Sequence, residues 1–229
     1  ALEGFNATIF AYGQTGSGKT HAIMGSNAEL GIIPRLGVEL FARIGAAPPD
    51  TSVVVTATYL ELYNEVICDL LAPGNQGLRI RQHIKNGIYV EDLTEVQVSS
   101  HAEIERLIHA GNKSRQVAAT RMNERSSRSH ALFTVNVRQT SVDAEGNSRV
   151  LSSKLTLVDL AGSERADMAA DSARLAEGAA INKSLSQARA AWHIAARRAG
   201  TGAWVGASRT GSSRHDMRCD AMRCDAVLC

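Results

Sequence analysis

The architecture of this chain follows from the motif Gly13-Gln14-Thr15-Gly16-Ser17-Gly18-Lys19-Thr20, which matches the pattern G-x-x-x-x-G-K-[S/T] in full. An apolar run at residues 8–12 indicates a buried strand before the motif, and a helix is expected over residues 19–24. The glycines let the backbone wrap around phosphate groups, and the start of the helix favours an anion. Lys19 would reach the β- and γ-phosphates, and Thr20 would offer its hydroxyl to Mg²⁺. A chance glycine-rich loop is the alternative, and the flanking strand and helix disfavour it.

A second motif, Asp159-Leu160-Ala161-Gly162-Ser163-Glu164, directly follows an apolar strand expected over residues 151–160. An aspartate at the end of a strand can hold a Mg²⁺-bound water, and Gly162 can present its backbone N–H to a γ-phosphate. Taken alone, Asp159 could equally be an ordinary cap at the end of a strand. Together with a phosphate-binding loop, it favours a nucleotide site.

A third motif is Asn123-Glu124-Arg125-Ser126-Ser127-Arg128-Ser129-His130. Two adjacent hydroxyl groups before an arginine suit a loop that closes on Mg²⁺ and a γ-phosphate. The competing interpretation is that these polar residues only cap the next strand, which is expected over residues 131–139.

Composition sets the class of protein. Apolar residues make up 44% of the 229 residues, which is enough for a substantial core, and the formal net charge is only +2. No apolar run approaches the roughly 20 residues that a membrane helix needs, so no membrane insertion is expected. No nucleic-acid-binding motif is visible either. The cysteines show no disulfide framework in the patterned part of the chain, which fits a reducing compartment.

The alternation of apolar runs and helical spacing predicts an α/β protein. A strand over residues 51–63 is rich in Val, Thr and Tyr, whereas residues 65–71 suggest a short helical or turn segment. A helix is expected over residues 102–110, and another from residue 173 or 177 to residue 186. Short strands of a solvated ribbon are expected at residues 78–82 and 89–98.

The three motifs and their order resemble the kinesin motor family, in which they correspond to the P-loop, switch I and switch II. Further segments resemble family landmarks: GFNATIFAY (residues 4–12), GIIPR (31–35), ELYNE (61–65) and EGAAINKSL (177–185). The segments YVEDL (89–93) and GNKSR (111–115) are most similar to the cargo-transporting kinesin-three subfamily. The resemblance covers residues 1–186. It implies an α/β protein with a three-layer P-loop NTPase fold and a central mixed, mostly parallel sheet. It also implies a Mg²⁺-dependent, microtubule-stimulated ATPase of the cytoplasm and cytoskeleton.

The resemblance also implies roles for single residues. His21 would lie beside the adenine of ATP, after the P-loop residues 13–20. Arg128 would form a salt bridge with Glu164 when the site closes, and Ser127 would help to place the attacking water. The expected catalytic residues are Ser127, Arg128, Gly162 and Glu164, and the expected metal-binding residues are Thr20, Ser126, Ser127 and Asp159.

Microtubules are the partner that the resemblance implies. The helix around residues 181–185 and the ribbon bearing Arg79, Arg81 and Lys85 would face the acidic surface of tubulin. The alternative for these three basic residues is an ordinary solvated strand face.

The resemblance further predicts a motor domain that is incomplete at both ends. Nothing before Ala1 corresponds to the R-x-R-P strand of the family, so the strand at residues 8–12 is expected to be an exposed edge. Residues 187–229 contain seven Arg and no Lys, and the sequence MRCDA occurs twice in succession. They are predicted to be a genuine, disordered tail or, as we favour, the product of a misjudged exon boundary or reading frame. Two other functions stay open: a nucleotide- or tubulin-binding fragment without motor activity, and a P-loop switch protein that is not a motor.

Overall fold

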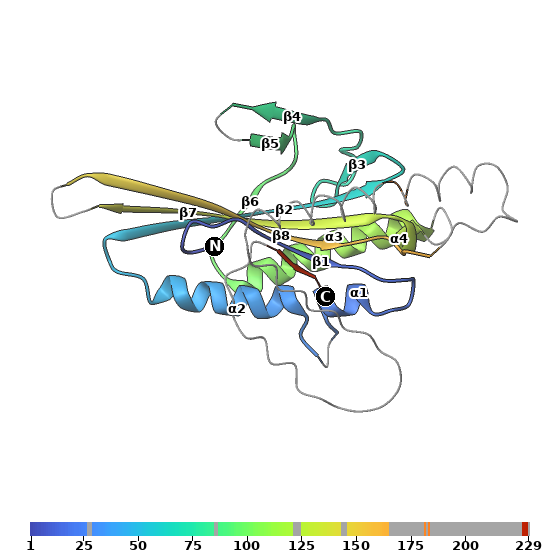
Figure 1. Ribbon diagram of the computed structural model, residues 1–229, viewed down its shortest axis with the longest axis horizontal. Coiled ribbons are helices and arrows are strands. Elements are labelled where there is room, and N and C mark those ends of the chain that lie inside the picture. The colour runs from blue at the N-terminus through green and yellow to red at the C-terminus, as the bar shows by residue number, and fades with distance from the viewer. Residues whose placement is uncertain are drawn as a thin grey trace, which may run out of the picture.

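A computed structural model describes residues 1–26, 29–84, 87–120, 125–142, 146–164, 181, 183 and 226–228 (Figure 1). Strand β1 (Ala7–Ala11) leads through a glycine-rich loop to helix α1 (Lys19–Met24), as the sequence predicted. The chain continues with α2 (Ile32–Gly45), β2 (Thr51–Tyr63), β3 (Val66–Asp69), β4 (Ile80–His83), β5 (Gly87–Val90), β6 (Val96–Val98), α3 (His101–Thr120), α4 (Arg125–Arg128), β7 (His130–Val142), β8 (Ser148–Asp159) and β9 (Ala226–Leu228).

The central sheet has seven strands in the order β3-β2-β7-β8-β1-β9, with β6 paired to β2. A mixed sheet was predicted and is confirmed, but the expectation of mostly parallel strands is wrong for the described residues. Strand β1 pairs parallel with its neighbours β8 and β9. Strand β2 pairs antiparallel with β3, β6 and β7, and β7 pairs antiparallel with β8. The reason is that the chain reverses directly after β7, so that Val142 lies opposite Ser148 and the two strands form one long hairpin.

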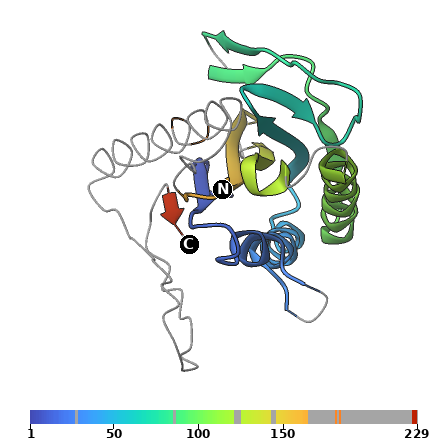
Figure 2. The same ribbon diagram turned by 90° about the vertical axis from the view of Figure 1, so that its right-hand side faces the viewer.

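Helices α1, α2 and α3 lie on the same face of the sheet, as Figures 1 and 2 show. The second helical layer of the predicted three-layer fold falls largely outside the described residues. From that part of the chain, Ile181 packs against a cluster on the sheet that contains Val158 and Leu160. No helix among the described residues is long and apolar enough to cross a membrane.

The core forms between the sheet and the helical layer. Alternate residues of β2 and β7 point inward, and the rings of Tyr59 and Phe133 meet edge to face with centroids 5.5 Å apart. Helix α3 contributes the buried residues Ile104 and Ile108. Gly111, on the same face of α3, lies so close to the Tyr59 ring that a Cβ at this position would overlap it.

Four local predictions were wrong. Residues 89–98 do not form one strand of the ribbon, because β5 ends at Val90 and β6 pairs with β2 of the central sheet. Residues 65–71 are not helical, because Val66–Asp69 forms a strand that pairs with β2. Helix α3 is longer than expected, since polar residues after residue 110 hide its periodicity. The expected exposed edge at β1 is also absent, because β9 pairs with it between Thr8 and Phe10. The rest of the predicted tail, residues 187–225 and 229, lies outside the described residues.

Replacing Gly111 by alanine tests the close approach of α3 to the sheet. The added methyl group must displace α3 or the ring of Tyr59, so we expect the free energy of unfolding to fall by about 1–3 kcal/mol. Gly45→Ala is the matched control, because a methyl group on Gly45 would meet no atom within 4 Å. Alanine there should leave stability unchanged or raise it by up to ~1 kcal/mol through helix propensity. Equal effects of the two substitutions in urea denaturation would contradict the packing described.

Candidate functional site

The P-loop, residues 13–20, runs from the end of β1 into α1. Gly16 and Gly18 have φ values of 78° and 92°, a left-handed conformation that glycine adopts without strain. The Lys19 ammonium donates hydrogen bonds to the carbonyl oxygens of Gly13 and Gln14, at 2.9 and 2.8 Å. Partial burial lowers the pKa of Lys19, although the carboxylates of Asp159 and Glu164 oppose the shift. The loop therefore holds the Lys19 cation against its own backbone carbonyl oxygens.

The three motifs meet at one edge of the sheet. Because β1 and β8 are parallel, with Ala11 opposite Asp159, the P-loop and switch II (residues 159–164) leave the sheet side by side. Strand β7 is antiparallel to β8, so its first residue, His130, which is also the last residue of switch I (residues 123–130), lies at this edge as well. The structure thus brings together the three segments that the sequence motifs occupy.

Four successive backbone amides of switch II hold these segments together. Two of them bind the β1 side of the site, and two bind residues of switch I. The donors and acceptors are Leu160 to the Ala11 carbonyl (3.2 Å), Ala161 to His130 Nδ1 (3.1 Å), Gly162 to the Ser127 carbonyl (2.8 Å) and Ser163 to the Gly13 carbonyl (3.1 Å). Switch II therefore bridges the P-loop and switch I through its own backbone.

Thr20 and Asp159, two of the predicted metal-binding residues, are in direct contact. The Thr20 hydroxyl donates a hydrogen bond of 2.6 Å to Asp159 Oδ2. Asp159 Oδ1 is buried and has no hydrogen-bond partner among the described residues. Hydroxyl and carboxylate oxygens are ligands that Mg²⁺ accepts, and Mg²⁺ usually takes few protein ligands beside phosphates and water. The residues present therefore fit a P-loop magnesium site.

Switch I is only partly described. Ser127 and Arg128 lie in the single helical turn α4, whereas residues 121–124 and the side chain of Ser126 fall outside the described residues. The predicted roles of Ser126, Ser127 and Arg128 stay predictions.

The carboxylate of Glu164 lies against the P-loop. It accepts a hydrogen bond of 2.9 Å from the Thr15 amide and another from the Thr15 hydroxyl. Burial raises the pKa of Glu164, but these two hydrogen bonds and the charge of Lys19 outweigh it, so the pKa is below its usual value. A Cβ on Gly162 would meet the ends of the Glu164 and Thr15 side chains, so a larger residue there would displace the Glu164 carboxylate from this position. The predicted pair between Arg128 and Glu164 stays a prediction.

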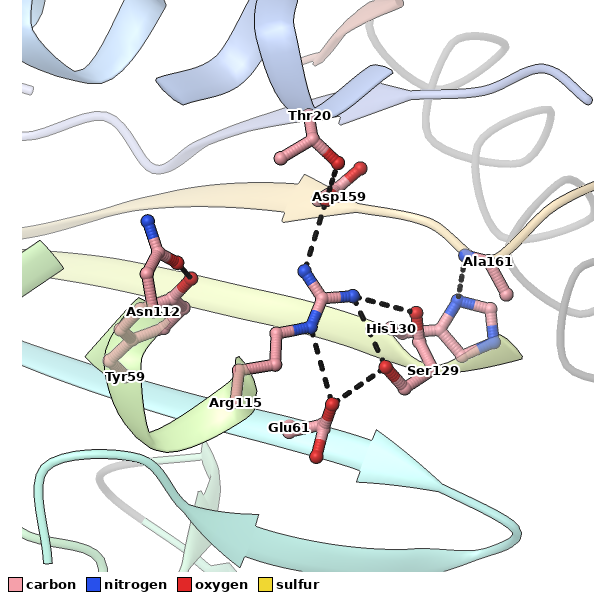
Figure 3. Close-up of polar contacts among 9 residues, drawn as sticks. All are labelled: Thr20, Tyr59, Glu61, Asn112, Arg115, Ser129, His130, Asp159 and Ala161. Carbon is pink, nitrogen blue, oxygen red and sulfur yellow. Dashed lines mark hydrogen bonds and ion pairs between the residues drawn. The ribbon is translucent and has the colours of Figure 1, made fainter. Parts of the chain in front are cut away.

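Sequence reasoning missed a buried ionic network behind this site, drawn in Figure 3. The guanidinium of Arg115, which is 6% exposed, lies between the carboxylates of Glu61 and Asp159, at 3.2 Å from each. It also donates to the carbonyl and hydroxyl oxygens of Ser129, at 3.2 and 3.1 Å. The Ser129 hydroxyl in turn donates to Glu61 at 2.7 Å. The network thus joins β2, α3, the residue just before β7 and the end of β8.

Two sequence signals could have revealed this network. Glu61 comes two residues after Tyr59 in β2, so the alternation of a strand places its carboxylate on the same inward, apolar face. Arg115 continues the buried stripe of α3 four residues after Gly111, so helical spacing also turns it inward. Charges of opposite sign at two buried positions are expected to pair.

Other predicted residues lie on the surface. His21 is exposed on α1, with its Nε2 atom 4.0 Å from the Glu29 carboxylate, and its role beside adenine stays a prediction. On the β4–β5 ribbon, Arg79 is exposed and Arg81 forms an ion pair of 2.9 Å with Glu91. Lys85 lies outside the described residues.

The helix predicted to end at residue 186 is described at only two positions. Ile181 and Lys183 are helical; Ile181 packs toward the sheet, and Lys183 is exposed.

Substituting Arg115 by methionine tests the buried network. The change leaves two carboxylates buried without their cation, so we expect the free energy of unfolding to fall by about 3–5 kcal/mol. Arg43→Met is the matched control, because the ion pair of Arg43 with Glu39 is exposed on α2 and should contribute at most ~1 kcal/mol. Adding Glu61→Gln to Arg115→Met should recover part of the loss. Comparable losses for Arg115→Met and Arg43→Met in chemical denaturation would disprove the network's importance.

Sequence comparison identifies relatives of the chain. A family profile described as "Kinesin motor domain" matches residues 1–193. Rat kinesin-like protein KIF1B is 53% identical over 192 residues, which cover 81% of this chain and 11% of the relative. Kinesin-related protein 1 of Dictyostelium discoideum is 50% identical over 195 residues, covering 81% and 9%. Mouse KIF13A is 50% identical over 191 residues, covering 81% and 11%. Because KIF1B and KIF13A are kinesin-three members, the predicted subfamily resemblance is confirmed.

Solved structures agree with these relatives. A fast kinesin superposes with a TM-score of 0.76 at 39% identity, covering 86% of this chain and 56% of the other. A KIF14 dimer, solved with AMP-PNP in complex with a microtubule, gives 0.74 at 43% identity, covering 87% and 57%. The chain spans about a tenth of the curated relatives and little more than half of the solved chains. These similarities confirm the predicted α/β P-loop fold. The chain belongs to the kinesin family.

Proposed function

We propose that this chain carries the ATP-hydrolysing site of a microtubule motor, in which loss of the γ-phosphate drives movement along microtubules. The observation that carries the proposal is the junction at the end of β8. There, consecutive amides of switch II contact both the P-loop and switch I. A γ-phosphate bound at the P-loop would lie where all three segments can respond to it.

Each residue of the site would have a separate role in phosphoryl transfer. Lys19 supplies a positive charge to the β- and γ-phosphates after exchanging its contacts with the P-loop carbonyls. Thr20 and Asp159 would hold Mg²⁺, which when bound neutralises charge on the phosphate oxygens. The Gly162 amide, which now donates to the Ser127 carbonyl, would donate to the γ-phosphate instead. The Ser127 side chain would orient the attacking water. Closure of Arg128 onto Glu164 would complete the site only when the switches meet.

Microtubules are the proposed partner, since the related KIF14 structure contains a microtubule. The β4–β5 ribbon stands apart from the main sheet in Figure 1 and presents the exposed cation of Arg79. Lys183, beyond switch II, is a second exposed cation. Such residues would steer the domain toward an acidic surface, although the ion pair of Arg81 with Glu91 reduces what Arg81 contributes. Association with microtubules would place the protein in the cytoplasm, on the cytoskeleton.

Replacing Lys19 by alanine tests nucleotide binding. Loss of a charge-assisted contact of about 1.5–3 kcal/mol should weaken the affinity for a fluorescent ATP analogue by roughly 10- to 100-fold. Lys154→Ala is the control, because Lys154 is exposed on β8 and its amide bonds to Asn6 before β1, whereas the P-loop follows the other end of β1. Unchanged affinity in Lys19→Ala would remove the P-loop assignment.

Single and double substitutions test the proposed salt bridge between Arg128 and Glu164. Arg128→Ala and Glu164→Ala should each abolish microtubule-stimulated phosphate release while leaving ATP binding largely intact. The double variant should be little worse than either single variant, as expected of residues that act as one unit. Additive losses would show that the two residues act separately. Nucleotide binding without stimulated turnover in the unaltered chain would instead favour the alternative function, a binding fragment.

A further inference from the structure

We propose that His130 is a positioning residue for γ-phosphate recognition, because its imidazole fixes the Ala161 amide of switch II while the next amide, of Gly162, changes partner. The inference rests on the proposed function and assigns to His130 a part in distinguishing ATP from ADP.

His130 is the first residue of β7 and is buried, with 6% of its surface exposed. Its Nδ1 atom accepts the Ala161 N–H at 3.1 Å, across 31 residues of sequence (Figure 3). Ala161 is fully buried, so its amide cannot take water as a substitute partner. The bond therefore ties the interior of switch II to a strand paired on both sides by β2 and β8.

The bond requires the neutral imidazole with the proton on Nε2, because Nδ1 acts as the acceptor. The surroundings favour this form. Burial and the nearby Arg115 guanidinium lower the pKa of His130, while the carboxylates of Asp159 and Glu65 oppose the shift without reversing it. His130 is thus kept as an acceptor at neutral pH.

His130 is the one side chain among the acceptors of the four successive amides at this junction. Leu160, Gly162 and Ser163 all donate to backbone carbonyls, which substitutions do not remove. Gly162 must release the Ser127 carbonyl before it can donate to a phosphate oxygen. If Ala161 remains fixed to β7, this exchange needs only a local rotation of the Gly162 peptide. If Ala161 is released, the whole segment is free to move, and the bound geometry must be ordered at an entropic cost.

A purely structural role would have different consequences. Loss of a hydrogen bond that only stabilises the fold would weaken ADP and ATP analogues alike, or neither. A positioning role affects only ligands with a γ-phosphate, since ADP does not reach the Gly162 amide. The ratio of the two affinities therefore separates the roles.

The matched pair His130→Asn and His130→Gln provides the test. Asn Oδ1 is bonded to Cγ, as His Nδ1 is, and can still accept the Ala161 N–H. The Gln amide has the same chemistry, but its oxygen lies one bond further out, at the level of Nε2. The measurements are the affinities of both variants and the unaltered chain for fluorescent ADP and AMP-PNP, with Mg²⁺ at about pH 7.5, where the imidazole is neutral, and a thermal melt of each protein.

We expect His130→Gln to bind AMP-PNP about tenfold more weakly, equivalent to ~1.4 kcal/mol, and ADP within about twofold of the unaltered chain. His130→Asn should recover most of the AMP-PNP affinity. Equal losses for both nucleotides, or equal behaviour of the two variants, would overturn the positioning role alone. An unaltered chain that binds neither nucleotide would overturn the proposed function and this inference with it.

Discussion

Ala11 lies opposite Asp159 in the parallel pairing of β1 with β8, and this register determines where the functional segments leave the sheet. A shift of one residue would turn Asp159 away from Thr20, because successive side chains of a strand point to opposite faces. The register is held at its end by the bond from the Leu160 amide to the Ala11 carbonyl. The P-loop, switch II and the proposed metal-binding oxygens of Thr20 and Asp159 take their positions from this pairing, and the pairing of β7 with β8 adds switch I.

The contacts of the Asp159 carboxylate link this junction to the buried ion pairs behind it. Asp159 serves two neighbours through one oxygen: Oδ2 accepts the Thr20 hydroxyl and faces the Arg115 guanidinium, which leaves Oδ1 without a partner among the described residues. Such an orphaned buried acceptor costs free energy, and a functional role is one reason for a protein to retain it. Its location suits coordination of a cation or its water. Arg115 therefore belongs both to the core and to the site, since it compensates the charge of Asp159 from the protein side.

The sequence predicted the local elements with strong patterns and missed those that depend on distant contacts. Residues 51–63 were recognised as a strand because β-branched and aromatic residues extend over its whole length. The P-loop was recognised because its glycine pattern is specific. By contrast, Arg115 was passed over because its partner Glu61 is 54 residues away, and β3 because four residues carry little periodicity. The contact of His130 with Ala161 is equally long-range and has no local signature.

The contact of Gly111 with Tyr59 gives α3 a mechanical property. Gly111 lies near the middle of α3, so its close approach to Tyr59 marks a point about which a tilt of the helix would turn. With a rise of about 1.5 Å per residue, the end leading into switch I lies about 14 Å from this point and the opposite end about 15 Å. At that opposite end, His101 packs against Gly37 of α2. Because the two arms are nearly equal, a tilt of α3 about Gly111 that begins at switch I would displace the other end by a similar distance in the opposite direction.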